Sequence, residues 1–258
     1  SIEQGELSDS ALAQRRSPLR ANVIEAFNAW HSAEVKPDDI CLFYYSGHGA
    51  LELAAPEFAH LEPDGMNETF VCLDSRNEGQ RDLLDKELAW LLSRAKKRLE
   101  NGHLLVITDS CHSGGATRSS DVLTRDRRES SSDSATPFEE IVGVLNVPVQ
   151  ERIFELKGKK AFYSYEAPHI HLAAARDCET AKETHIEGQQ HGIFTWNFLR
   201  VLGSGGTALS YRELMRRTEI MVRSMVSNQL PQLNALAGAQ KVDSFLGGAL
   251  ASAVTEYP

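Results

Sequence analysis

The sequence predicts an α/β fold in which a mostly parallel sheet lies between helices. Two apolar runs, residues 40–45 and 103–108, lead directly into small residues that carry one reactive side chain each, the imidazole of His48 and the thiol of Cys111. Such runs are typical of buried strands that deliver a side chain to their carboxyl end, where α/β sheets hold their sites. The two side chains are 63 residues apart, so a parallel sheet would have to bring them together.

The spacing of apolar residues predicts the other elements in turn. We expect helices at residues 19–35 and 83–99, and further strands at 69–73 and 169–175. Residues 50–67 are rich in Glu, Pro and Gly and are expected to form a loop. Residues 116–160 mix serine with arginine, which predicts a flexible insertion within a single domain spanning residues 1–258.

Composition narrows the function classes. The 258 residues are 41% apolar and 24% charged, which is ordinary for a soluble globular protein. The net charge of −9 argues against nucleic acid as a partner and would tolerate cationic peptides. Neither a signal peptide nor a membrane helix is indicated. The four cysteines show no CxxC or zinc spacing, which indicates a reducing, cytoplasmic location and inert core thiols at Cys41, Cys72 and Cys178.

Two motifs carry a family resemblance. Tyr-Ser-Gly-His-Gly at residues 45–49 and Asp-Ser-Cys-His-Ser-Gly at residues 109–114 resemble the reactive turns of the caspase-like (clan CD, C14) cysteine peptidases, the metacaspases most closely. The likeness covers about residues 20–118 and 169–235 and implies a caspase-like (caspase-hemoglobinase) fold. That family has N-terminal strands with no counterpart in this chain. We therefore expect the chain to be the C-terminal part of a longer polypeptide or one product of a cut.

The two motifs predict a Cys–His dyad. A thiolate attacks a peptide carbonyl well, and a neighbouring imidazole accepts the thiol proton and later protonates the leaving amine. Cys111 is the predicted nucleophile and His48 the predicted general base and acid. The resemblance implies that the backbone N–H groups of Gly49 and Cys111 hold the oxyanion. The alternative is a buried cysteine and a core histidine in glycine-rich turns, or a catalytically dead relative.

Substrate choice is predicted to rest on acidic residues. Metacaspases cut after Arg or Lys, and Asp109 lies two residues before Cys111, where its carboxylate could pair with a guanidinium. The resemblance adds Ser46 to that pocket, and Asp177 is a further candidate. The alternative for Asp109 is an acid that orients a backbone turn, and for Asp177 a helix cap.

Control by cleavage is a second expectation. Four arginines follow the nucleophile within the predicted insertion and are candidate processing sites, at Arg118, Arg125, Arg127 and Arg128. They would be cut by the protein itself or by an upstream protease; the alternative is a solvated linker. The resemblance also makes a zymogen, a regulatory domain and a prokaryotic defence setting plausible, although no residue shows the last.

No cofactor or metal is predicted. Calcium activates many metacaspases, but the acidic residues that could serve are scattered, at Glu62, Asp64, Glu68 and Asp74. His169 and His171 would share one strand face, yet two ligands without a third make a poor metal site. The functional prediction is an endopeptidase that cuts proteins or peptides after Arg or Lys. The alternatives are a catalytically silent scaffold of the same fold and a Cys-dependent acyl transferase.

Overall fold

The computed structural model describes twelve stretches of the chain: residues 17–31, 35–77, 79–110, 123–124, 128–129, 134–144, 153–156, 159–162, 167–176, 179–205, 208–235 and 243–248. Five of the predicted site residues lie outside these stretches: Cys111, Arg118, Arg125, Arg127 and Asp177. Within the described part of the chain, no helix has the length and apolar character needed to cross a membrane.

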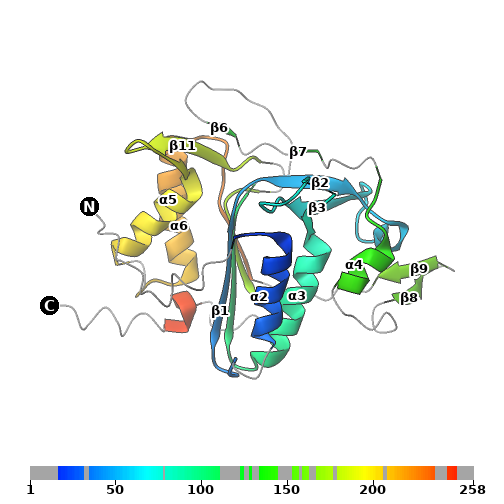
Figure 1. Ribbon diagram of the computed structural model, residues 1–258. Helices are drawn as coiled ribbons and strands as arrows, with labels where there is room; N and C mark the ends of the chain where they lie inside the picture. The colour runs from blue at the N-terminus through cyan, green and yellow to red at the C-terminus, as the bar shows by residue number, and fades with distance from the viewer. Residues whose placement is uncertain are drawn as a thin grey trace.

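A four-stranded sheet forms the centre of the fold, as predicted (Figure 1). Its order is β1 (Ile40–Ser46), β5 (His103–Asp109), β10 (Ile170–Ala173) and β13 (Gln232–Ala235). The first three strands are parallel and β13 is antiparallel to β10. A mostly parallel sheet is therefore confirmed, and its carboxyl edge collects the ends of β1, β5 and β10.

Two pairs of helices cover the sheet on opposite sides, as Figure 1 shows. One pair is α2 (Arg20–Trp30) with α3 (Asp85–Arg98), and the other is α5 (Ile193–Gly203) with α6 (Tyr211–Met225). The central strand β5 is buried along its whole length and divides its side chains between the two cores. Leu104 and Val106 join the core under α2 and α3, whereas Leu105 and Ile107 join the core under α5 and α6.

The register of β1 against β5 is set where β5 begins. The His103 N–H donates to the Asp39 carbonyl at 3.0 Å, and Ile40 then pairs with His103. Gly102 passes so close to this turn that a Cβ would lie 2.5 Å from the Asp39 oxygen and 2.7 Å from the Pro37 oxygen. Only glycine fits that approach. The same register places Ser46 opposite Asp109 at the far end.

Beyond the carboxyl edge of β1, the chain forms a second sheet that the sequence did not predict. β2 (Gly49–Leu53) and β3 (Met66–Phe70) form an antiparallel pair, with Gly49 opposite Phe70. β4 (Leu83–Leu84) and β7 (Arg128–Glu129) flank them, and η1 (Pro56–Phe58) lies in the connection. The predicted loop over residues 50–67 is confirmed for the connection at 54–65, apart from η1, but its two ends belong to β2 and β3. Leu51 and Leu53 flank a single polar residue, which is too brief an alternation to stand out.

The predicted flexible insertion at residues 116–160 also needs correction. α4 (Phe138–Val144) packs into the core with Phe138, Ile141 and Val142 buried, and Phe138 lies against Phe58. β8 (Ile153–Leu156) pairs with β9 (Lys159–Phe162). The remaining elements are β6 (Leu123–Thr124), β11 (Lys182–Ile186), β12 (Gln189–Gly192) and η4 (Phe245–Gly248). α4 has only one apolar cluster, which is too short to show helical period in the sequence.

A buried carboxylate ties three helices together. Glu87, in the first turn of α3, has no exposed surface and accepts hydrogen bonds from Arg81 at 2.7 and 2.8 Å. It also accepts from Arg20 of α2 and from the backbone N–H of Leu84. Arg81 in turn donates to Glu140 of α4 at 3.0 Å. A charge this deep is tolerated because every side of the carboxylate is hydrogen-bonded.

We expect Glu87→Ala to lower the free energy of unfolding by about 3–5 kcal/mol, because Arg20 would lose its buried acidic partner and Arg81 would keep only the more exposed Glu140. Urea unfolding followed by circular dichroism measures this change. The matched control is Glu219→Ala, which removes a carboxylate paired only with the exposed Arg223 and should cost about 0–1 kcal/mol. Equal losses in the two variants would contradict the structural role assigned to Glu87.

Candidate active site

His48 lies in the turn between β1 and β2, and its backbone is held from two sides. Its carbonyl accepts from the Tyr45 hydroxyl at 2.6 Å and from the Val71 N–H at 3.1 Å. The Tyr45 ring covers Gly47 so closely that a Cβ there would lie 2.7 Å from the Tyr45 hydroxyl oxygen. This explains the glycine before His48. The half-buried imidazole thus projects from a turn whose path is fixed.

The turn that carries Cys111 begins next to the turn that carries His48. Ser46 pairs with Asp109, and the Gly47 N–H donates to the Asp109 carbonyl at 3.3 Å, beyond the end of the regular ladder. Adjacent strands lie about 4.8 Å apart. Cys111 itself is outside the described residues and follows the buried Ser110 directly. The sheet therefore brings the starts of the two predicted reactive turns together.

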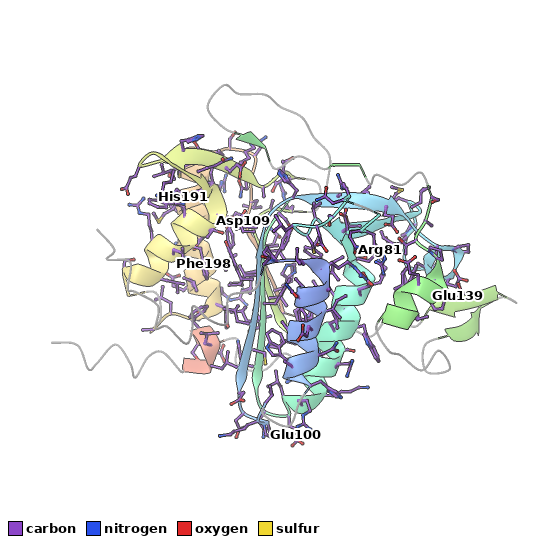
Figure 2. All side chains as sticks on the ribbon, viewed as in Figure 1. Arg81, Glu100, Asp109, Glu139, His191 and Phe198 are labelled. Carbon is purple, nitrogen blue, oxygen red and sulfur yellow. The ribbon has the colours of Figure 1, made fainter. Side chains whose placement is uncertain are left out.

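Asp109 is completely buried at the carboxyl end of the central sheet (Figure 2). Its Oδ2 accepts from the Thr195 hydroxyl at 2.6 Å and from the Thr195 backbone N–H at 3.1 Å. Thr195 is the third residue of α5, so the carboxylate caps the positive end of that helix. This contact corresponds to the alternative in which the acid orients a turn, and the substrate-binding role stays a prediction.

Thr195 also contacts a residue of β1. Its Oγ1 lies 3.0 Å from the hydroxyl oxygen of Tyr44, which is exposed on the edge strand. The sequence analysis did not identify either residue as part of the site. A signal was present, because Thr195 stands in the Gly-x-Phe-Thr start of a helix. Nothing in the sequence, however, indicated which carboxylate that helix would meet.

The other predicted residues that the structure describes lie near the same end of the sheet. Ser46 is exposed and directly opposite Asp109. Gly49 is buried and is the first residue of β2. Arg128 is in β7, where its backbone pairs with Ala50, the residue after Gly49.

A hollow of about 720 Å³ opens beside His48. Its lining combines the turn at residues 46–48 with apolar side chains from β1, from the start of α2 and from the segment after β3, among them Val23, Phe43, Phe70, Val71 and Leu73. A concave surface with mainly apolar walls and a few polar groups is the usual form of a ligand site. The hollow therefore offers room for substrate next to the imidazole.

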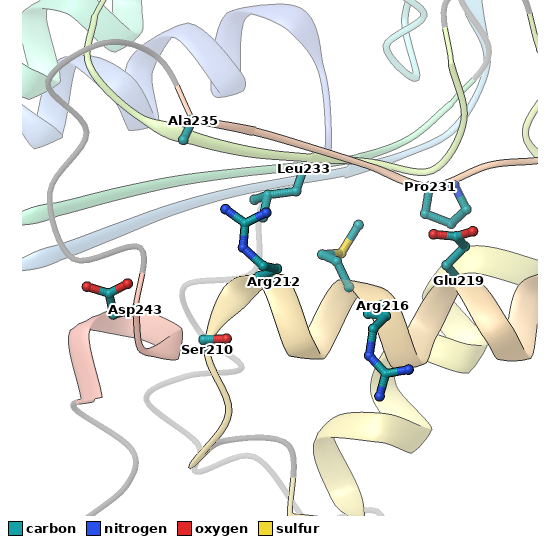
Figure 3. A pocket seen from close by; sticks show the side chains of 9 residues that line it. Ser210, Arg212, Arg216, Glu219, Pro231, Leu233, Ala235 and Asp243 are labelled. Carbon is teal, nitrogen blue, oxygen red and sulfur yellow. The ribbon is translucent and has the colours of Figure 1, made fainter.

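A second hollow, of about 380 Å³, lies between α6 and β13 (Figure 3). It is lined by two arginines and two acids, Arg212, Arg216, Glu219 and Asp243, together with small and apolar residues. None of its lining residues is a predicted site residue, and none carries a thiol or an imidazole. The chemistry therefore points to the hollow at His48.

The acidic residues considered for calcium do not converge. Glu62 binds the ammonium of Lys86, which also binds Asp85 at 2.5 Å. Asp64 accepts from the Met66 N–H, and Asp74 accepts from the Arg20 N–H. His171 contacts the Thr108 hydroxyl and His169 the Ala167 carbonyl. Among the described residues, no three His, Cys, Asp or Glu side chains form a group suited to a metal ion.

Two of the three cysteines predicted to be core thiols are described, and both are free and buried. Burial raises the pKa of Cys41 to about 11, with Asp39 adding to the effect. Burial likewise raises the pKa of Cys72 to about 12, with a further increase from Asp74. Both thiols are therefore protonated at neutral pH, as the prediction of unreactive core cysteines requires. Cys178 lies outside the described residues.

The comparisons with known proteins agree with one another on the family and on the fold. A model of the caspase domain, peptidase C14, matches residues 11–241. Metacaspase-1 of Schizosaccharomyces pombe is 28% identical over 92% of the chain, and metacaspase-1A of Aspergillus oryzae is 26% identical over 88%. The chain spans 58% and 57% of these two relatives. A crystal structure of a Geobacter sulfurreducens protein shares the fold with a TM-score of 0.55 and 24% identity, covering 88% of this chain and 77% of that one.

The contact between Thr195 and Asp109 yields a stability prediction. Thr195→Val removes the hydroxyl donor and leaves a fully buried carboxylate with the backbone N–H alone at Oδ2, which should cost about 1–3 kcal/mol in the free energy of unfolding. Thr195→Ser keeps the hydroxyl and should cost less. Urea unfolding of the two variants and the parent measures the difference. A valine variant as stable as the parent would contradict the role assigned to this hydrogen bond, because valine keeps the methyl group and loses only the hydroxyl.

Proposed function

Because the chain belongs to the caspase-domain family of cysteine peptidases, we propose that it cleaves peptide bonds with Cys111 as nucleophile and His48 as general base. The observation that carries this proposal is the pairing of Ser46 with Asp109, which starts both reactive turns from the same edge of the sheet. Parallel neighbouring strands are the arrangement in which an imidazole and a thiol 63 residues apart can meet.

The proposed chemistry follows from the groups at that edge. His48 accepts the thiol proton as the Cys111 sulfur attacks the carbonyl carbon, and it then protonates the departing amine. Water hydrolyses the thioester and regenerates the thiol. The backbone N–H groups of Gly49 and Cys111 are the proposed oxyanion donors, and donors of this kind contribute about 10²–10³ in rate. The fixed path of the turn at His48 favours such preorganised donors.

The proposed specificity is for Arg or Lys before the cut bond. Asp109 supports it as a buried carboxylate directly opposite Ser46. Because Asp109 has no exposed surface, a substrate guanidinium would reach it only after a local rearrangement of the groups around it. A buried carboxylate that substrate cannot reach directly is what we expect of an enzyme that must be activated before it accepts substrate.

We propose cleavage near Arg128 as one such activation step. β7 runs parallel to β2, with Arg128 beside Ala50. The backbone of a candidate processing site thus lies one residue from Gly49, a proposed oxyanion donor. Short edge pairing of two residues costs little to break. Arg118, Arg125 and Arg127 remain candidates on sequence grounds.

We expect fluorogenic peptides ending in Arg or Lys to be cleaved, and peptides ending in Asp to be left intact. Cys111→Ala should lower turnover by about 10³-fold or more, because the nucleophile is lost. His48→Ala should lower it by about 10²–10⁴-fold, because proton transfer is lost. N-terminal sequencing of the incubated parent protein should reveal new ends after Arg128 or a neighbouring arginine.

The control for this experiment is Cys41→Ala, which removes a buried thiol that does not line the hollow beside His48 and should leave turnover near the parental rate. Cleavage after Asp would refute the proposed role of Asp109 while keeping the dyad. Turnover that survives in Cys111→Ala would refute the dyad. A folded protein that binds such peptides without cleaving them would favour the catalytically silent scaffold. This result would have to persist after trypsin has cut the segment at residues 116–160 and has been removed.

We propose further that activity needs no calcium, because Lys86 already neutralises Glu62 and Asp85. Turnover of the Arg peptide should be the same in about 1 mM calcium and in EDTA. Lys86→Met provides the comparison, since it removes the internal cation and leaves the carboxylates. A parental enzyme that is active only with calcium would contradict the proposal.

A further inference from the structure

The connection between β10 and β11 lies next to the strand that leads to Cys111. This connection spans residues 174–181, of which 174–176 and 179–181 are described. It begins as an extension of the sheet, because the Ala174 N–H donates to the Thr108 carbonyl at 2.9 Å. Thr108 stands three residues before Cys111. A peptide bound at Cys111 would therefore lie next to this connection, on the side of β5 that faces β10.

One buried side chain holds both ends of the connection. Gln229 is 1% exposed, and its Nε2 donates to the Ala174 carbonyl at 3.1 Å while its Oε1 accepts from the Lys182 N–H at 3.0 Å. The amide therefore uses its donor at one end of the connection and its acceptor at the other. A side chain shorter than glutamine, or one without both functions, would leave a buried backbone group unsatisfied.

The residue after Gln229 holds the middle of the same connection. The Leu230 N–H donates to Glu179 Oε2 at 2.8 Å, and Glu179 Oε1 accepts from Arg176. Burial acts to raise the pKa of Glu179, but the hydrogen bonds from Arg176 and Leu230 outweigh it and hold the pKa below its usual value. The segment at 229–230 thus fixes the connection at its start, its middle and its end.

The path of the chain links this connection to Asp109 as well. Lys182 begins β11, the β11–β12 hairpin leads straight into α5, and Thr195 of α5 binds Asp109. Displacement of Lys182 would therefore shift both the β10–β11 connection and the start of α5, which lie on two sides of the proposed substrate.

We propose that Gln229 is a positioning residue for substrate, which holds the β10–β11 connection beside the end of β5, where it would contact the peptide residues before the cut bond. This rests on the proposed peptidase function. Gln229 acts through the connection and takes no part in proton transfer or attack. Its loss should therefore weaken the use of peptide substrates while leaving the thiolate chemistry of Cys111 intact.

The test compares Gln229→Leu, Gln229→Glu and the matched control Gln232→Leu. Gln232 also donates two hydrogen bonds from its Nε2, but to Leu230 and Pro231 of its own segment. For each protein, kcat and KM are measured on a peptide of four residues ending in Arg, and the rate of Cys111 alkylation by iodoacetamide is measured by mass spectrometry. The rate of alkylation by iodoacetamide measures the reactivity of the Cys111 thiolate, and it does not depend on peptide binding at the β10–β11 connection.

We expect Gln229→Leu to lower kcat/KM by about tenfold or more, mainly through KM, with the alkylation rate within about twofold of the parent. Gln229→Glu keeps the acceptor for Lys182 and should lose less. Gln232→Leu should match the parent in both measurements. If Gln229→Leu fails to fold, Gln229→Glu allows the same comparison. Glutamate has the size of glutamine and retains the acceptor for the Lys182 N–H, but it loses the donor to the Ala174 carbonyl.

Two results would overturn the inference: an unchanged kcat/KM in both Gln229 variants, or a loss in kcat/KM matched by an equal loss in alkylation, which would indicate a general structural effect. Failure of the proposed function looks different. In that case the parent enzyme itself would leave the peptide uncut although Cys111 is alkylated.

Discussion

The parallel pairing of β1 with β5 is the constraint on which the rest of the structure depends. Side chains alternate along a strand, so a slip of one residue would send His48 or Cys111 toward the wrong face. The close approach at Gly102 fixes the register at one end, and the bond from Gly47 to Asp109 extends it at the other. A register held at both ends is what starts two distant motifs from the same edge of the sheet.

The carboxyl edge of the sheet is then completed by polar side chains that satisfy buried backbone. Asp109 caps α5, Gln229 bridges Ala174 and Lys182, and Tyr45 binds the His48 carbonyl. The contacts of Asp109 and Gln229 join segments that are far apart in the chain, whereas the Tyr45 bond closes its own turn. Because buried polar groups are costly when left unpaired, the same contacts that stabilise the fold also restrict the geometry of the site.

The sequence predicted three strands of the central sheet, β1, β5 and β10, and the helices α2 and α3, because their apolar patterns are long enough to show. β5 is seven residues of continuous burial, and α3 carries a clear apolar stripe. It did not predict β2, α4 or the role of Thr195, because these depend on tertiary contacts. α4 is a helix of seven residues whose position comes from Phe58 and from the bond between Arg81 and Glu140. Short elements that depend on contacts with residues far away in the sequence show little of the local apolar pattern from which secondary structure is predicted.

Asp109 shows how one residue can combine a structural and a proposed substrate role. A buried carboxylate keeps its charge only when donors compensate it, and the start of α5 supplies two of them through Thr195. Those two hydrogen bonds hold the carboxylate in a position with no exposed surface, where a pair with a guanidinium would be charge-assisted and shielded from solvent. The helix cap therefore prepares the proposed specificity site, and access to Asp109, more than its charge, becomes the step that activation has to control.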